Sequence, residues 1–192
     1  MAFIPVCEPM LAGNELKYVT EAVSTGWISS SGKYVTEFEN QFAEYCGCKY
    51  GIAVCNGTIA LHLALIGLGI GKGDEVIVPT FTMIASAFAV CYTGAKPVFV
   101  DADKDTWNID VKKIEEKITS KTKAIMPVHI FGKMCDMDAI HALAKKYNLY
   151  VLEDAAEAHG ASYHGVKAGA SSDIAAFSFF ANKNITTGEG GM

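Results

Sequence analysis

Lys183 stands in a position suited to covalent chemistry on a small molecule. It follows a short β-like run, residues 174–180, and precedes a segment rich in small and hydroxyl residues. This pattern places its amine on a loop at the carboxyl end of a strand, which is the edge of an open α/β sheet where ligands bind. A lone lysine is more often a solvated surface residue, so the interpretation depends on what the rest of the chain supplies.

Two other stretches supply groups that complement this amine. Asp154 ends an apolar run, so its carboxylate is expected where a strand leaves the sheet. A glycine turn opens a helix further upstream, and the N–H groups of Gly57, Thr58 and Ile59, with the Thr58 hydroxyl, form an anion site suited to a phosphate. Pyridoxal phosphate (PLP) needs such an amine and phosphate site, and a carboxylate that keeps its pyridine nitrogen protonated. The sequence therefore predicts a PLP site.

Three motifs in this order resemble the DegT/DnrJ/EryC1/StrS family of sugar aminotransferases. They are the run Asn56-Gly57-Thr58, the segment 153–160, and the segment from Ser178 through Lys183 to Gly191. The resemblance covers essentially the whole chain. Within the family, segments 26–35, 126–132 and 178–192 are most similar to the perosamine synthase branch.

The resemblance implies an α/β fold, the three-layer α/β/α large domain of PLP-dependent transferases of fold type I (aspartate aminotransferase-like), with a mostly parallel sheet. Residues 1–192 would form this PLP-binding domain, without the smaller C-terminal domain of the family. The implied reaction moves an amino group from glutamate to a nucleotide-linked 4-keto-6-deoxy sugar, GDP-linked in the perosamine branch, for surface polysaccharide such as lipopolysaccharide O-antigen. The implied assembly is a homodimer or a higher homo-oligomer.

Roles for individual residues follow from the same resemblance. Lys183 would bond to the cofactor and then carry a proton between the substrate carbon and the cofactor's C4′. Asp154 would pair with the pyridine nitrogen, although a strand-end cap is its structural alternative. Ser178 matches the phosphate-binding serine of the family, and could equally be a buried hydroxyl bonded to the backbone.

Two positions depart from the family pattern. Glu157 stands where many members carry a glutamine near the cofactor's phenolic oxygen, and an acid there is either held protonated or repelled by that oxygen. Met83 stands where many members place an aromatic residue against the pyridine ring. A thioether can also pack against a ring.

Three further residues are candidates for the sugar side of the pocket. Trp27 lies on the polar loop 24–32, where it is either a buried indole between two helices or a wall of the substrate pocket. His129 follows a predicted strand and is expected at the active edge of the sheet. His159 either lines the pocket or is a hydrogen-bonded structural histidine.

Two alternatives to an active aminotransferase stay open. Sugar 3-dehydratases of the same family carry a histidine in place of the lysine, so Lys183 favours transamination. The chain stops at Met192, where family members continue through a strand inside the sheet and the smaller domain, so the chain could be a truncated, inactive fragment. A sheet that lacks an interior strand exposes edges that pair with other chains, and this also favours an oligomer.

The elements that must position these groups alternate along the chain. Apolar spacing predicts strands at residues 51–54, 75–78, 97–100, 124–128, 150–153 and 174–180. It predicts helices at residues 14–24, 33–46, 58–69, 83–93, 110–118 and 136–147, the last with Asp136 as its N-cap and Asn148 as its C-terminal stop. Such alternation is typical of a mostly parallel sheet covered on both faces.

A dinucleotide-binding site is the rival interpretation of the glycine-rich run 67–73. That fingerprint must follow a strand and open a helix. These glycines instead close a predicted helix and lead into a predicted strand, so we interpret them as a helix stop and turn.

Composition limits the remaining classes of function. A chain of 192 residues fits one domain, and its net charge of −5 argues against a nucleic-acid or anionic-membrane partner. No signal peptide and no apolar run long enough to span a membrane is apparent, so we expect a cytoplasmic protein. Cys46-Gly47-Cys48 has no partner pair at zinc-finger spacing, and we therefore expect no metal site.

Overall fold

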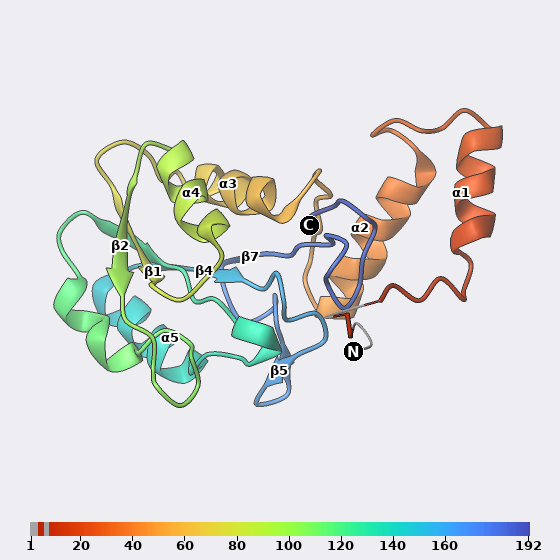
Figure 1. The fold of residues 1–192 in the computed structure, drawn as a ribbon. Helices are drawn as coiled ribbons and strands as arrows, with labels where there is room; N and C mark the ends of the chain where they lie inside the picture. Colours follow the sequence, from red (N-terminus) through yellow and green to blue (C-terminus); the bar gives the residue numbers. More distant parts are fainter. Residues whose placement is uncertain (1–3, 6–7) are drawn as a thin grey trace.

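A computed structural model describes residues 4–5 and 8–192 of the chain. Its centre is a sheet of five parallel strands in the order β2-β1-β3-β4-β7 (Figure 1). The strands are β1 (Glu75–Pro79), β2 (Lys96–Val100), β3 (Thr122–Ile125), β4 (Tyr150–Asp154) and β7 (Ile174–Ala176). A separate antiparallel hairpin joins β5 (Ser162–Tyr163) to β6 (Val166–Lys167).

Helices cover both faces of this sheet and make three layers. One face carries α3 (Gly57–Gly67) and α4 (Ile84–Tyr92), and the other carries α5 (Met137–Tyr147) with the short 3₁₀ turns η1 (Val111–Lys113) and η2 (Glu115–Lys117). Strand β1 is buried along its whole length. Its Val76 packs with α3 and α4, whereas its Ile77 packs with α5, because alternate side chains of a strand point to opposite faces. The predicted α/β/α architecture is confirmed.

The caps of α5 are those that the sequence predicts. The Asp136 side chain accepts a hydrogen bond from the N–H of Ala139 at 3.1 Å, which satisfies one of the open donors of the first turn. Asn148 adopts φ +54° and ends the helix in the left-handed conformation. Likewise, the glycines of run 67–73 close α3 and lead into β1, with Gly69 and Gly73 at positive φ.

Three predicted elements differ most from the structure in type or length. Residues 51–54 form no strand and contribute only an isolated bridge from Val54 to Gly191, because a cavity separates the segment from β7. Residues 110–118 form the turns η1 and η2 instead of an α-helix, since the Asp110 side chain bonds the N–H of Lys112 and only Ile114 is fully buried. The strand predicted at 174–180 ends at Ala176.

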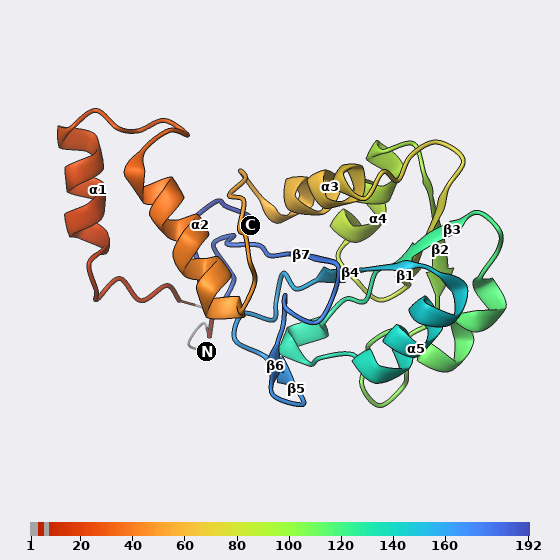
Figure 2. The same ribbon diagram turned by 180° about the vertical axis from the view of Figure 1, so that it is seen from behind.

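Helices α1 (Glu15–Ser24) and α2 (Lys33–Cys46) lie at one end of the molecule (Figures 1 and 2). The C-terminal half of α2 packs against the segment before Lys183, with Phe42 in T-shaped contact with Phe177 and Phe179. In contrast, α1 buries none of its residues. No helix within residues 4–5 and 8–192 is long and apolar enough to cross a membrane.

Candidate active site

A cavity of about 380 Å³ lies at the carboxyl ends of β3 and β4 and contains Lys183. We refer to it as the Lys183 cavity. Parallel strands bring their carboxyl ends to one edge of the sheet, and the N-terminus of α3 and the loop before α4 meet there. The Lys183 cavity brings together eight site residues predicted from the sequence, which are Gly57, Thr58, Met83, His129, Asp154, Glu157, Ser178 and Lys183.

The first turn of α3 and Ser178 form one end of this cavity. A Cβ atom on Gly57 would lie only 2.7 Å from the Cβ atom of Ser178, so this close approach requires glycine. The predicted set of three N–H donors needs one correction, because the N–H of Ile59 already donates to the Asn56 side chain at 3.0 Å. Gly57, Thr58 and the Ser178 hydroxyl are therefore the groups suited to an anion.

Asp154 forms the buried part of the cavity wall and is 4% exposed. Its Oδ2 accepts a hydrogen bond from Ser86 Oγ at 2.7 Å, and its Oδ1 accepts one from the N–H of Ala156 at 3.2 Å. Burial raises the pKa of the Asp154 carboxyl, and the two hydrogen bonds partly offset that effect.

Sequence reasoning missed Ser86. It stands in the apolar helix α4 beside Ala87 and is fully buried. A serine inside an apolar helix needs a hydrogen-bond partner when it is buried. This pattern was the feature of the sequence that could have identified Ser86.

Lys183 and Glu157 face each other across the cavity. Lys183 Nζ lies 3.3 Å from Glu157 Oε1, and both side chains are partly buried. The other oxygen of Glu157 accepts a hydrogen bond from the N–H of Phe131 at 2.9 Å, at a turn where Phe131 has φ +49°. Asn184 donates to the carbonyl of His159 at 3.2 Å, which ties the loop that carries Lys183 to the loop after β4.

His129 lies in the cavity wall, but its ring nitrogens already have partners within the fold. Nδ1 accepts the N–H of Cys135 at 3.2 Å, so Nε2 carries the proton and donates to Glu153 Oε2 at 2.9 Å. Glu153 also accepts from the N–H of Gly169 and from Ser172 Oγ, at 3.1 and 2.6 Å. Burial alone would raise the pKa of Glu153, but these hydrogen bonds lower it. The network holds the His129 ring in a structural position.

The structure places His159 and Trp27 away from the Lys183 cavity. His159 is 7% exposed and packs with Phe42, Phe177 and Phe179, with a ring separation of 5.0 Å from Phe179. Neither ring nitrogen reaches a hydrogen-bond partner among the described residues. Trp27 is 59% exposed on the loop between α1 and α2, so it is not the buried indole of the structural alternative. Neither residue lines the cavity.

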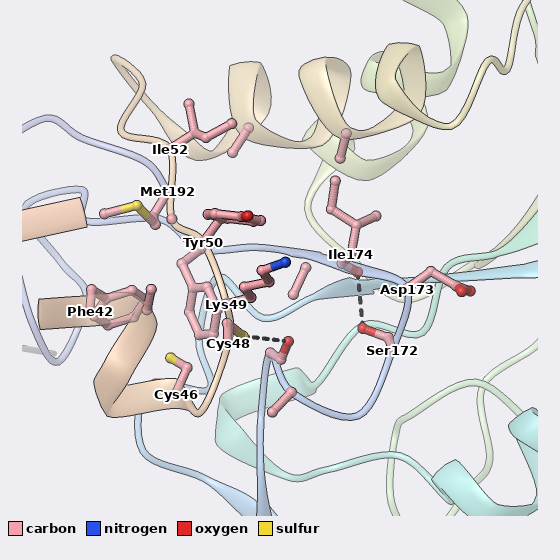
Figure 3. A pocket seen from close by; sticks show the side chains of 18 of the residues that line it. Phe42, Cys46, Cys48, Lys49, Tyr50, Ile52, Ser172, Asp173, Ile174 and Met192 are labelled. Atoms are coloured by element: carbon pink, nitrogen blue, oxygen red, sulfur yellow. Dashed lines mark hydrogen bonds between the residues drawn. The ribbon is translucent and has the colours of Figure 1, made fainter. Parts of the chain in front are cut away.

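A second and larger cavity, of about 550 Å³, opens beside β7 (Figure 3). We refer to it as the sheet-edge cavity. Gly191 pairs with Val54 through N–H···O bonds of 2.9 and 3.0 Å, and Met192 pairs with Phe177 through bonds of 2.9 and 3.2 Å, at the rim of this cavity. Its lining is mostly apolar, with Phe42, Tyr50, Ile52, Leu63 and Ile174. Because, of the two cavities, only the smaller Lys183 cavity combines an amine, a buried carboxylate and a helix N-terminus, we take it as the candidate active site.

Comparison with known proteins relates nearly the whole chain to one family. The sequence pattern of the DegT/DnrJ/EryC1/StrS aminotransferase family matches residues 9–192. A protein of Caulobacter vibrioides named GDP-perosamine synthase is 60% identical over 189 residues, which cover 98% of this chain and 51% of that protein. The chain thus spans about half the length of the curated relatives it matches.

Solved structures show the same fold. The aminotransferase from Psychrobacter cryohalolentis superposes with a TM-score of 0.89 at 45% identity, covering 96% of this chain and 48% of that chain. The crystal structure of NtdA from Bacillus subtilis with bound cofactor PMP superposes with a TM-score of 0.85 at 40% identity, covering 92% and 40%. The chain belongs to the DegT/DnrJ/EryC1/StrS aminotransferase family.

Proposed function

We propose that this chain is the cofactor-binding part of a PLP-dependent sugar-nucleotide aminotransferase. The observation that carries the proposal is the meeting of Lys183, Asp154 and the N-terminus of α3 in one cavity. These are an amine, a buried carboxylate and an anion site, which PLP needs together. The cofactor PMP bound in the NtdA structure, the amine form of PLP, supports the same cofactor here.

The residues present fit PLP in type and placement. Gly57, Thr58 and Ser178 would hold its phosphate, and the glycine allows the close approach that a Cβ atom would block. Asp154 would hold the proton on the pyridine nitrogen, and Met83, 66% exposed in the cavity wall, would cover the ring. When bound, PLP supplies an aldehyde and an electron-accepting ring.

Lys183 provides the amine that reaches the cofactor and carries a proton during transfer. Its separation of 3.3 Å from Glu157 supports an orienting contact between the two side chains. Glu157 keeps its own place through the N–H of Phe131. This acid stands where the family resemblance leads us to expect a glutamine beside the phenolic oxygen, and we propose that it orients Lys183.

The substrates are proposed from relatives. The name GDP-perosamine synthase of the Caulobacter protein supports a GDP-linked sugar as the substrate. That the amine acceptor is a 4-keto-6-deoxy sugar follows from the family resemblance. Glutamate as the donor, O-antigen or other surface polysaccharide as the destination, and the cytoplasm as the location follow from the family resemblance. His129, His159 and Trp27 lack support as sugar contacts in the arrangement of this chain.

We also propose that residues 1–192 are the large domain of a longer enzyme and that the sheet-edge cavity receives a further strand. Gly191 already pairs with Val54 on one side and bridges Ser178 on the other, as a strand entering between two neighbours would. The half-length coverage of relatives agrees with this proposal. Unpaired strand edges and apolar surface also favour association of chains into a homodimer or higher oligomer.

An inactive fragment is the second candidate, and the open sheet-edge cavity favours it. One experiment separates the two. PLP-loaded chain is mixed with glutamate, and the 2-oxoglutarate released is counted against a Lys183→Arg control. Release approaching one molecule per chain, absent in the control, supports the aminotransferase. PLP binding with no release supports the inactive fragment.

A further inference from the structure

Ser86 and Thr82 connect the Lys183 cavity to the buried Asp154 carboxylate. Ser86 Oγ lies 2.7 Å from Asp154 Oδ2 and 2.7 Å from Thr82 Oγ1. Ser86 is fully buried in the first turn of α4, whereas Thr82 is half-buried just before that helix and lines the cavity. The three side chains thus form a continuous chain of hydrogen bonds from the cavity wall to the carboxylate.

Chemistry fixes the direction of these hydrogen bonds. An ionised carboxylate only accepts, and each hydroxyl has one hydrogen to donate. Ser86 therefore donates to Asp154, and Thr82 donates to Ser86. Both hydrogens point toward the carboxylate, so the outer hydroxyl polarises the inner one and strengthens its bond.

Asp154 needs this support because it is almost completely removed from water. Burial of a carboxylate favours its neutral form. A neutral acid could not hold the proton on a pyridine nitrogen. The N–H of Ala156 supports the other carboxylate oxygen at 3.2 Å, and the charge of Lys183 also favours the ionised form.

We propose that Ser86 is a positioning residue that keeps Asp154 ionised and fixed in one orientation, with Thr82 as its outer donor. The proposal rests on the proposed function, because the orientation matters only if Asp154 meets a cofactor nitrogen. Ser86 itself has no exposed surface and acts solely through Asp154.

Four variants separate this role from a general loss of stability. Ser86→Ala removes the inner donor. Thr82→Val removes the outer donor at nearly constant shape, and Thr82→Ser restores it. Ser172→Ala is the matched control, because Ser172 donates at 2.6 Å to a different buried carboxylate, Glu153.

The first measurement uses the cofactor-free chain and needs no PLP chemistry. Urea unfolding is followed between about pH 4 and pH 8. The raised pKa of Asp154 contributes stability at low pH that is lost as pH rises through its folded value. Ser86→Ala raises that pKa further, so its stability should fall more steeply with pH, and Asp154→Asn should abolish the difference. Equal pH profiles for Ser86→Ala and wild type would overturn the positioning role.

The second measurement is PLP affinity, with the pH profile of the bound cofactor's visible absorbance. Loss of one hydrogen bond to a charged group predicts binding weakened about tenfold or more in Ser86→Ala and about threefold in Thr82→Val. Thr82→Ser and Ser172→Ala should stay within about twofold of wild type.

The two measurements distinguish failure of the positioning role from failure of the proposed function. If wild type binds no PLP, the proposed function fails, and the cofactor-free pH profiles still decide whether Ser86 supports Asp154. If wild type binds PLP and both Ser86→Ala and Thr82→Val match its affinity and pH profile, the positioning role fails and the proposed function stands. Thr82→Val keeps the test decisive if Ser86→Ala does not fold.

Discussion

The two cavities of this chain differ in what their walls provide. In the Lys183 cavity, an amine, carboxylates, hydroxyls and a helix N-terminus converge from four separate segments. The sheet-edge cavity is larger but mostly apolar, and its rim carries the strand-like pairing of Gly191 and Met192. The walls of the first cavity therefore suit a polar ligand, whereas those of the second suit apolar protein.

Glu153 connects these two regions. It accepts hydrogen bonds from His129, which lines the Lys183 cavity, and from Gly169 and Ser172, which line the sheet-edge cavity. The carboxylate itself is fully buried. Any substitution there should therefore affect both cavities at once.

The largest expected effect is on cofactor binding by a substitution at Gly57. In Gly57→Ala the new Cβ atom would lie only 2.7 Å from the Cβ atom of Ser178. Because this clash disturbs the anion site, we expect the dissociation constant for PLP to rise about a hundredfold. Gly67→Ala is the matched control in the sheet-edge cavity, because nothing lies within 4 Å of its added Cβ atom. Absorbance titration with PLP measures both, and equal affinities of the two variants would remove the basis for the comparison.

A smaller effect, on the stability of the whole fold, is expected from a substitution of Glu153. Glu153→Gln leaves His129, Ser172 and Gly169 competing for one fewer acceptor oxygen, so the free energy of unfolding should fall by about 3 kcal/mol. Urea denaturation measures this, with the exposed Glu116→Gln as a control that should change stability by less than about 0.5 kcal/mol. A loss at Glu153 no larger than that of the control would show that the two cavities are independent.

A still smaller effect, on the pH dependence of stability, is expected from His159, which lines neither cavity. Burial lowers the pKa of the His159 imidazole. The unfolded chain binds a proton below the ordinary histidine pKa of about 6.5, whereas the folded chain does not, so stability should fall as pH drops below that value, by at most about 1.4 kcal/mol per pH unit.

His159→Phe tests that origin, because phenylalanine suits the cluster with Phe42, Phe177 and Phe179. The difference in unfolding free energy between wild type and variant, measured at each pH, should shrink or reverse in favour of the variant as pH falls. Because both proteins contain Asp154, its opposite contribution to the pH dependence cancels when the two free energies are subtracted. PLP affinity should stay unchanged, and a large loss would return His159 to the active site.

The sequence predicted which residues share the Lys183 cavity better than it predicted the orientation of their side chains. Residue types and strand ends were enough to bring Lys183, Asp154 and Gly57 to one cavity. The sequence pattern could not decide whether the side chains of His129 and His159 point into the cavity, because a histidine beside a strand end suits a pocket or a buried network equally well. The partners of His129 and the aromatic neighbours of His159 come from segments distant in sequence.

The limits of the fold prediction have similar causes. Long runs of apolar residues at helical spacing predicted the bounds of α2 and α5 to within one residue. The run 110–118 carries helical spacing too, but the capping side chain of Asp110 and the single anchor Ile114 stabilise two short turns instead. Whether residues 51–54 pair as a strand depends on what fills the sheet-edge cavity, and local sequence holds no information about a distant partner.

Borohydride reduction identifies which amine of the chain bonds to PLP. The chain is mixed with PLP, reduced with borohydride and digested, and the peptides are weighed. We predict one modified peptide, with the cofactor on Lys183, and no such product in Asp154→Ala at limiting PLP because the cofactor is no longer retained. Modification spread over exposed lysines such as Lys96 or Lys146, equal in wild type and variant, would contradict the account.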